Sequence, residues 1–237
     1  MTGVSAGDSD FAVNDQVLIV GSGVWTDETV VSKATVTKIP NLSAEEAAVL
    51  PSFAAAWGIL NNFVTLKSGD VVVQTNASSA IGGAISQIGK ALGLKVVSIS
   101  DADLASADLL AKLKEAGSFK LAVSGRSGRH IGTLQRVVAK GGVTVTYNGV
   151  FESLHATANA QLPISNLIFN NTSVQGFDLN TFATHSPEAF RAGVSSVLAL
   201  VGEKKVTLKP AHVFSQAEYA KALEEVAKTG AAVALKH

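Results

Sequence analysis

A run of small residues after a short apolar segment is the clearest sign of chemistry in this sequence. Val71–Thr75 begins with three valines and predicts a buried strand. The following residues, Ala77–Gly82, are nearly all small, and helical periodicity begins within them. Small residues allow backbone N–H groups to approach a pyrophosphate, which the positive end of the next helix also attracts. The segment predicts a dinucleotide-binding turn, although Ala77 replaces the usual first glycine. A tight turn without a ligand is the alternative.

Two further positions lie where the rest of a dinucleotide would be held. Asp101 follows a predicted strand about 20 residues beyond the turn, at the usual place of a ribose-binding acid. Its carboxylate accepts hydrogen bonds from a free 2′-hydroxyl and repels a 2′-phosphate, which favours NADH over NADPH, and Asp103 adds to the repulsion. A solvated loop acid is the alternative. Tyr147-Asn148-Gly149 follows a later strand, where the nicotinamide half is expected, but Tyr147 also fits an ordinary strand-end aromatic.

The composition narrows the possible sites and partners. Of the 237 residues, 47% are hydrophobic and 16% charged, which indicates a large core in one large or two small domains. The sequence holds no cysteine, which excludes disulfides and cysteine-ligated zinc, and its five histidines are too scattered to predict a metal site. A net charge of zero gives no nucleic-acid signature. We expect no membrane span and no signal peptide.

Strands and helices are expected to alternate through the middle of the chain. The predicted helices are Ile81–Leu92, Leu104–Ala116 and Ile131–Ala139, and the predicted strands after Thr75 are Lys95–Ser100, Lys120–Val123, Val143–Tyr147 and Asn171–Phe177. This alternation favours the α/β class, with a parallel sheet covered on both faces.

The flanking parts of the chain follow other patterns. Residues 11–40 are β-rich, and residues after 179 are mostly helical. Ser43 and Glu46 form the pattern of a capping box, which predicts a helix over Glu45–Leu50. Pro51 is expected to end that helix, with a second one over Ala54–Phe63.

Several short segments, in this order and spacing, resemble the medium-chain dehydrogenase/reductase superfamily. The closest branch looks like the mitochondrial 2-enoyl thioester reductases, near the quinone oxidoreductases, and the match runs with breaks from about Phe11 to the C-terminus. The segments that carry the resemblance are Gly69-Asp70, Ala77–Gly83, Lys90–Gly93, Gly141-Gly142, Val145–Gly149 and His185–Pro187.

The resemblance implies a Rossmann-type α/β cofactor domain inserted into a GroES-like catalytic domain. Residues 1–55 would then form a truncated, β-rich GroES-like domain, residues 56–182 the cofactor domain and residues 183–237 the return to the catalytic domain. The family uses NADPH and no zinc to reduce the carbon–carbon double bond of a 2-enoyl thioester. A mitochondrial location is implied by the resemblance alone, with the cytoplasm as the alternative.

The resemblance also assigns cofactor contacts. The phosphate turn corresponds to Ser78, Ser79, Ala80 and Ile81, the nicotinamide-side strand end to Tyr147, Asn148, Gly149 and Val150, and a later lining segment begins at Phe177. Together with Asp101, these residues make up the expected cofactor-binding set. No catalytic residue is assigned, because neither Tyr147 nor Tyr219 matches the family tyrosine.

Other departures from the family pattern leave two functions open. A family asparagine appears as Ser52, and the arginines that hold the 2′-phosphate appear as Asp101 and Asp103. The family has a further edge strand between the positions of Ser118 and Phe119, so either this strand is missing or the sequence omits residues there. The first function is an NAD(P)H-dependent reductase of enoyl thioesters or quinones.

The second is an inactive homologue that serves as a structural or interaction subunit. In that role a homodimer or partner chains would cover open strand edges such as Val96–Ser100.

Overall fold

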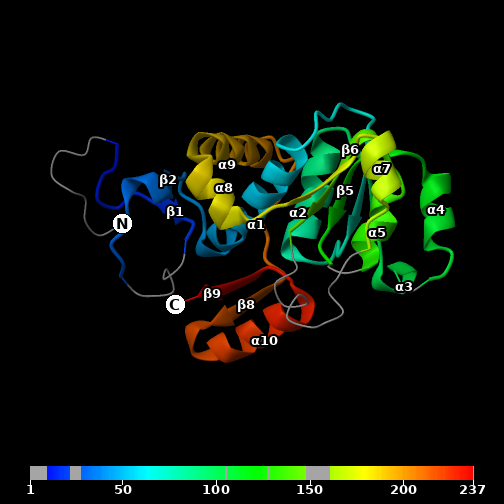
Figure 1. Ribbon diagram of the computed structural model, residues 1–237. Coiled ribbons are helices and arrows are strands. Elements are labelled where there is room, and N and C mark those ends of the chain that lie inside the picture. The colour runs from blue at the N-terminus through cyan, green and yellow to red at the C-terminus, as the bar shows by residue number, and fades with distance from the viewer. Residues whose placement is uncertain (1–9, 22–27, 105, 127–128, 148–160, 237) are drawn as a thin grey trace.

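The computed structural model describes residues 10–21, 28–104, 106–126, 129–147 and 161–236 (Figure 1). Its centre is a parallel sheet of five strands in the order β4-β3-β5-β6-β7. The strands are β3 (Val71–Thr75), β4 (Lys95–Ile99), β5 (Phe119–Ser124), β6 (Val138–Thr146) and β7 (Ser173–Gly176). The predicted α/β class and Rossmann-type sheet are therefore confirmed.

Alternate residues of the central strands β3 and β5 enter two separate cores. Val72 and Leu121 pack on one face of the sheet, and their neighbours Val73 and Ala122 pack on the other. The first core is shared with α1 (Ala44–Asn61), α2 (Ala80–Ala91) and α9 (Pro187–Gly202), and the second with α3 (Asp101–Leu104), α4 (Leu109–Ala116) and α5 (Arg129–Gln135). Figure 1 shows the sheet standing between α2 and α5. Both faces are thus covered, as expected of a parallel sheet.

Smaller elements complete the described fold. They are β1 (Val17–Ile19), antiparallel to β2 (Val36–Lys38) after the 3-10 turn Lys33–Thr35; α7 (Ile164–Phe169); α8 (Leu179–His185); and β8 (His212–Ser215), parallel to β9 (Val233–Lys236) and joined to it by the 3-10 turn Gln216–Glu218 and α10 (Tyr219–Thr229). Figure 1 places β8, β9 and α10 apart from the large sheet, below α1 and α2. None of the helices in the described ranges has the length and apolar character needed to cross a membrane.

The expected break at Pro51 is wrong. A single helix, α1, runs from Ala44 to Asn61 with Pro51 inside it, and the capping box of Ser43 and Glu46 opens it as predicted. Proline cannot donate to the preceding turn, which normally destabilises a helix interior. Here the residues on either side of Pro51, from Val49 to Leu60, are almost all buried against α2 and α9, and this packing outweighs the local cost.

Two other predicted boundaries are also wrong. The helix expected over Ile131–Ala139 ends at Gln135, and β6 already begins at Val138. Gly141 and Gly142 lie inside this strand, where the pairing register with β5 shifts. Gly141 has φ +73, and a Cβ on Gly142 would lie 2.8 Å from the Lys120 carbonyl oxygen. The two glycines therefore form a strand irregularity, which from sequence resembles a helix end.

The helix expected over Leu104–Ala116 is divided into two. The first, α3, begins at Asp101 and the second, α4, begins at Leu109. Gly117 and Ser118 are the whole connection from α4 to β5, and β4 is consequently an edge strand of the sheet.

Candidate nucleotide-binding site

The turn between β3 and α2 is organised by Asn76 and Ser79, which are both buried. Asn76 adopts a left-handed backbone with φ +58, which turns the chain out of the strand. The Ser79 hydroxyl donates to the Asn76 carbonyl oxygen at 2.8 Å and accepts from the Gly82 N–H at 3.1 Å, so Ser79 is the N-cap of α2. The predicted turn is therefore closed by its own side chains, with the helix starting at Ala80.

Gly82 brings the first turn of α2 into contact with the end of β3. A Cβ at this position would lie 2.3 Å from the Asn76 carbonyl oxygen and 2.8 Å from the Ala77 Cα. Both atoms belong to the backbone and cannot rotate away. Gly82 thus allows the close helix–strand packing that one glycine of the dinucleotide motif provides, even though Ala77 occupies the first glycine position.

The ends of three strands meet beside this turn. Gly125, just after β5, donates its N–H to the Thr75 hydroxyl at 3.0 Å and accepts from the Asn76 amide at 3.4 Å. Tyr147, just after β6, places its hydroxyl 3.1 Å from the Ser79 hydroxyl oxygen. The Ser79 proton is directed at Asn76, so Tyr147 is the donor in this pair. A Cβ on Gly125 would lie 2.3 Å from the Tyr147 hydroxyl, and only glycine leaves room for the ring.

Burial raises the pKa of the Tyr147 phenol above its usual value, although the bond to Ser79 and the charge of Arg126 act in the opposite direction. The folded state therefore holds this proton more tightly than the unfolded chain. The resulting stabilisation is complete below pH 10 and is lost as the pH rises through the raised pKa.

We predict that Tyr147 ionises at a higher pH in the folded protein than in the unfolded chain. Phenolate absorbance would be followed in a Tyr219→Phe background, because Tyr147 and Tyr219 are the only tyrosines. The loss of stability above pH 10 should be absent in the Tyr147→Phe variant. An ordinary tyrosine titration in the folded protein would show that the ring is solvated.

A segment from the far end of the chain also contacts the turn. The Ala80 N–H, the first of α2, donates to the Gly230 carbonyl oxygen at 2.9 Å. Gly230 caps the C-terminus of α10 with φ +65. The sequence pattern of a glycine after an amphipathic helix predicts such a cap. It does not indicate that the cap lies on α2, and sequence reasoning missed this contact.

The other predicted residues lie in different surroundings. Ser78 is exposed and Ile81 is half-buried, and neither backbone amide has a partner in the part of the chain that the structure describes. Asp101 is the first residue of α3. Asn148, Gly149 and Val150 lie outside the described residues.

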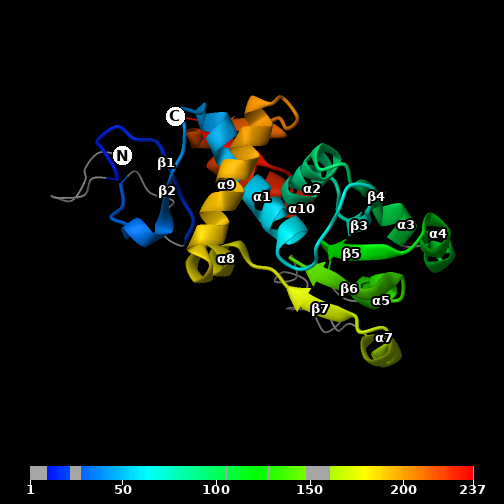
Figure 2. The same ribbon diagram turned by 90° about the horizontal axis from the view of Figure 1, so that it is seen from above.

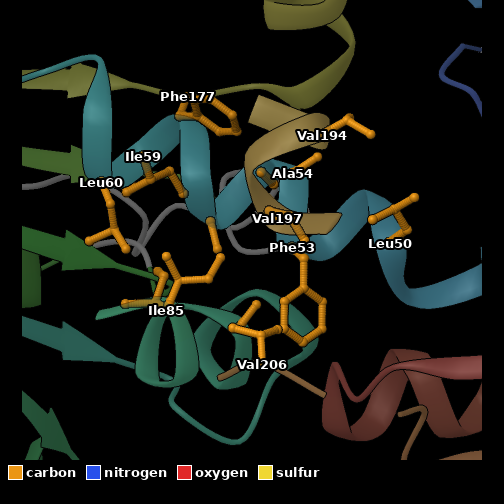
Figure 3. Packing of buried hydrophobic residues seen from close by; sticks show 14 of the residues in the cluster. Leu50, Phe53, Ala54, Ile59, Leu60, Ile85, Phe177, Val194, Val197 and Val206 are labelled. Atoms are coloured by element: carbon orange, nitrogen blue, oxygen red, sulfur yellow. The ribbon is translucent and has the colours of Figure 1, made fainter. Parts of the chain in front are cut away.

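Phe177 is placed in the first core, with 9% of its surface exposed. Its ring centroid lies 6.2 Å from that of Phe63 and 5.6 Å from that of Phe182. Figure 3 shows Phe177 beside α1, in the same cluster as Ile59 and Val194. The ring is committed to packing, and its predicted role in lining the cofactor remains a prediction.

A negative charge stands at the carboxyl end of β4. The Asp103 carboxylate accepts from the Ser100 hydroxyl at 2.6 Å, and the Lys112 ammonium lies 3.5 Å away. Hydrogen bonds from the Ser100 side chain and backbone hold the pKa of the Asp103 carboxyl below its usual range, so Asp103 is ionised at neutral pH. No group of three or more metal-ligating side chains occurs among the described residues.

No family model matches the chain. Among curated proteins, the chain is 27% identical over 225 residues to the mitochondrial enoyl-[acyl-carrier-protein] reductase of Dictyostelium discoideum, and 26% identical over 250 residues to the human one. These matches cover 84% and 94% of the chain but only 63% and 64% of the relatives. The chain thus spans about three fifths of the length of these relatives. The 250 aligned positions exceed the 237 residues of the chain, so the human protein contains residues that the chain lacks.

Solved structures of the same class share the fold. The mitochondrial 2-enoyl thioester reductase Etr1p/Etr2p heterodimer from Candida tropicalis superposes with a TM-score of 0.79 at 20% identity, over 98% of this chain and 77% of that one. The CurF ER cyclopropanase from the curacin A pathway gives 0.80 at 16% identity, over 99% and 76%. The chain is therefore similar in sequence to mitochondrial enoyl-[acyl-carrier-protein] reductases and shares the fold of solved 2-enoyl thioester reductases. This similarity supports an enoyl-reductase-like lineage within the medium-chain dehydrogenase/reductase superfamily.

Proposed function

We propose that the chain binds a nicotinamide dinucleotide at the β3–α2 turn and belongs to a reductase of 2-enoyl thioesters. The observation that carries the proposal is the turn itself, with its N-capped helix and close packing at Gly82, at the carboxyl ends of parallel strands. Ligands of open α/β sheets bind at this edge, and the helix N-terminus suits a pyrophosphate. The names of the curated relatives support the thioester substrate, with a quinone as the alternative.

A solved neighbour supports both ligands of this proposal, and residues of the turn have distinct roles in it. That neighbour, with a TM-score of 0.79 and 19% identity, is a complex of Etr1p with NADP and crotonyl-CoA. A reduced cofactor supplies the hydride when bound. The amides of Ser78, Ala80 and Ile81 are the donors for the pyrophosphate, of which those of Ser78 and Ile81 have no partner among the described residues. Tyr147 bonds to Ser79 and so holds the turn in shape. A mitochondrial location is proposed because the curated relatives are named as mitochondrial enoyl-[acyl-carrier-protein] reductases.

The cofactor we propose is NADH rather than NADPH. Asp101 and Asp103 stand at the end of β4, where the adenosine ribose of a dinucleotide lies in this fold. An ionised Asp103 repels a 2′-phosphate, whereas a carboxylate is a good acceptor for a free 2′-hydroxyl. Two carboxylates at this position therefore disfavour the added negative charge of a 2′-phosphate.

The test is a titration of the protein with NADH and NADPH, followed by cofactor fluorescence. NADH should bind at least about tenfold more tightly, and Asp101→Asn should narrow the preference by about tenfold, or about 1.4 kcal/mol. Asp108→Asn is the control, because Asp108 is an exposed acid whose side chain caps no helix. Failure of both cofactors to bind at millimolar concentration would refute the proposal.

A second candidate function is a structural or interaction subunit. The observation in its favour is α7, where Ile164, Ile168 and Phe169 are 59%, 66% and 76% exposed. This helix leads into β7, one edge strand of the sheet, and Figure 2 shows both at that edge. An exposed apolar helix beside an open strand edge is suited to binding another chain. This function would be favoured if no nucleotide binds and sedimentation shows self-association that ends when Phe169 is changed to a charged residue.

A further inference from the structure

We propose that the turn at residues 229–231 is a latch that competes with the nucleotide for the N-terminus of α2. The inference rests on the proposed function, since the competing ligand is the pyrophosphate of the dinucleotide. In the closed arrangement the Gly230 carbonyl accepts the Ala80 N–H at 2.9 Å. Ala80 is one of the donors that the anion would use, so the two acceptors cannot occupy this amide together.

The latch is built so that it can leave α2 without losing its own hydrogen bonds. The Gly230 N–H donates to the Val226 carbonyl at 2.8 Å, and the Ala231 N–H donates to the Thr229 hydroxyl at 3.1 Å. The Thr229 hydroxyl in turn donates to the Glu225 carbonyl at 2.7 Å. All of these bonds lie within the latch and α10. Release from α2 therefore exposes the Ala80 amide and the Gly230 carbonyl and leaves the turn intact.

The exchange of acceptors is favourable because of charge. A carbonyl oxygen is neutral, whereas a pyrophosphate oxygen is ionised, and charge-assisted hydrogen bonds are about twice as strong as neutral ones. The positive end of the 12-residue helix α2 adds to this preference. The latch thus satisfies the first amide of the helix when the site is empty. The latch also lowers the apparent affinity for the nucleotide, because only the molecules with an open latch are competent to bind.

Gly230 can be altered with a closely matched control. A Cβ on Gly230 would meet the Ser79 Cβ at 3.4 Å and would sit on a backbone with φ +65. Gly141 has φ +73, with nothing within 4 Å of its Cβ position. Alanine at either site costs about 1–2 kcal/mol of left-handed backbone strain. Only in the Gly230→Ala variant does this backbone strain act on the turn that contacts α2, where the added Cβ comes within van der Waals distance of the Ser79 Cβ.

The experiment measures binding of NADH and of inorganic pyrophosphate to the wild type, Gly230→Ala and Gly141→Ala. We expect Gly230→Ala to bind both ligands about threefold or more tightly, with no change in Gly141→Ala. In the wild type, the scalar coupling across the hydrogen bond between the Ala80 nitrogen and the Gly230 carbonyl carbon should disappear when NADH saturates the protein.

The outcomes separate the latch from the proposed function. If the wild type binds NADH while the coupling persists, or if Gly230→Ala binds no more tightly, the latch is refuted and the dinucleotide site stands. If only Gly230→Ala binds pyrophosphate, the latch is supported. If neither ligand binds any of the three proteins, both the latch and the proposed function fail.

Discussion

Replacing Gly82 with alanine is expected to destabilise the protein by about 3 kcal/mol and to weaken nucleotide binding by at least about tenfold. The added Cβ would lie 2.3 Å from the Asn76 carbonyl oxygen and 2.8 Å from the Ala77 Cα. These are backbone atoms, so the first turn of α2 must move away from β3. The same movement displaces the capped N-terminus that is to face the pyrophosphate. Urea unfolding and a cofactor titration measure the two effects.

The neighbouring glycine provides the control for this substitution. A Cβ on Gly83 would come no closer than 3.9 Å to another residue, which is an ordinary van der Waals contact. Alanine has a higher helix propensity than glycine, so Gly83→Ala should stabilise the protein by about 0.5–1 kcal/mol and leave binding intact. If Gly82→Ala and Gly83→Ala changed stability and nucleotide affinity equally, the close approach of α2 to β3 at Gly82 would not be what maintains the turn.

Substitution of Phe177 is expected to have an effect of similar size, for a different reason. Its ring is 9% exposed and contacts the rings of Phe63 and Phe182. Phe177→Ala should therefore destabilise the protein by about 3–5 kcal/mol through the lost burial and the cavity left behind. Phe169→Ala is the control, because Phe169 is 76% exposed, and the change in stability there should stay within about 0.5 kcal/mol.

A third variant distinguishes packing from cofactor contact at this position. Phe177→Leu keeps most of the apolar volume, so nucleotide affinity should stay within about twofold of the wild type if the ring only packs in the core. A large loss of affinity in Phe177→Leu with little change in unfolding free energy would instead support the cofactor-lining role predicted from the sequence.

The strands were predicted well because their sequence signal is local. In a parallel sheet both faces of a strand are buried, so Val71–Thr75 and Lys120–Val123 appear as short apolar runs whatever lies around them. The errors occurred where distant packing outweighed a local preference. Pro51 remains inside α1 because its neighbours are buried from both sides. Gly141 bends β6 where local reasoning expects the end of a helix.

The sequence by itself determined the α/β class, the absence of cysteine chemistry and the position of the small-residue turn after Val71–Thr75. These follow from residue type and short-range spacing. Only the tertiary structure decided what surrounds that turn. Tyr147 donates to Ser79 because parallel strands bring their carboxyl ends to one edge of the sheet, and Gly230 reaches Ala80 because the C-terminal segment packs back over α2. Such contacts join residues far apart in the chain, and no local pattern encodes them.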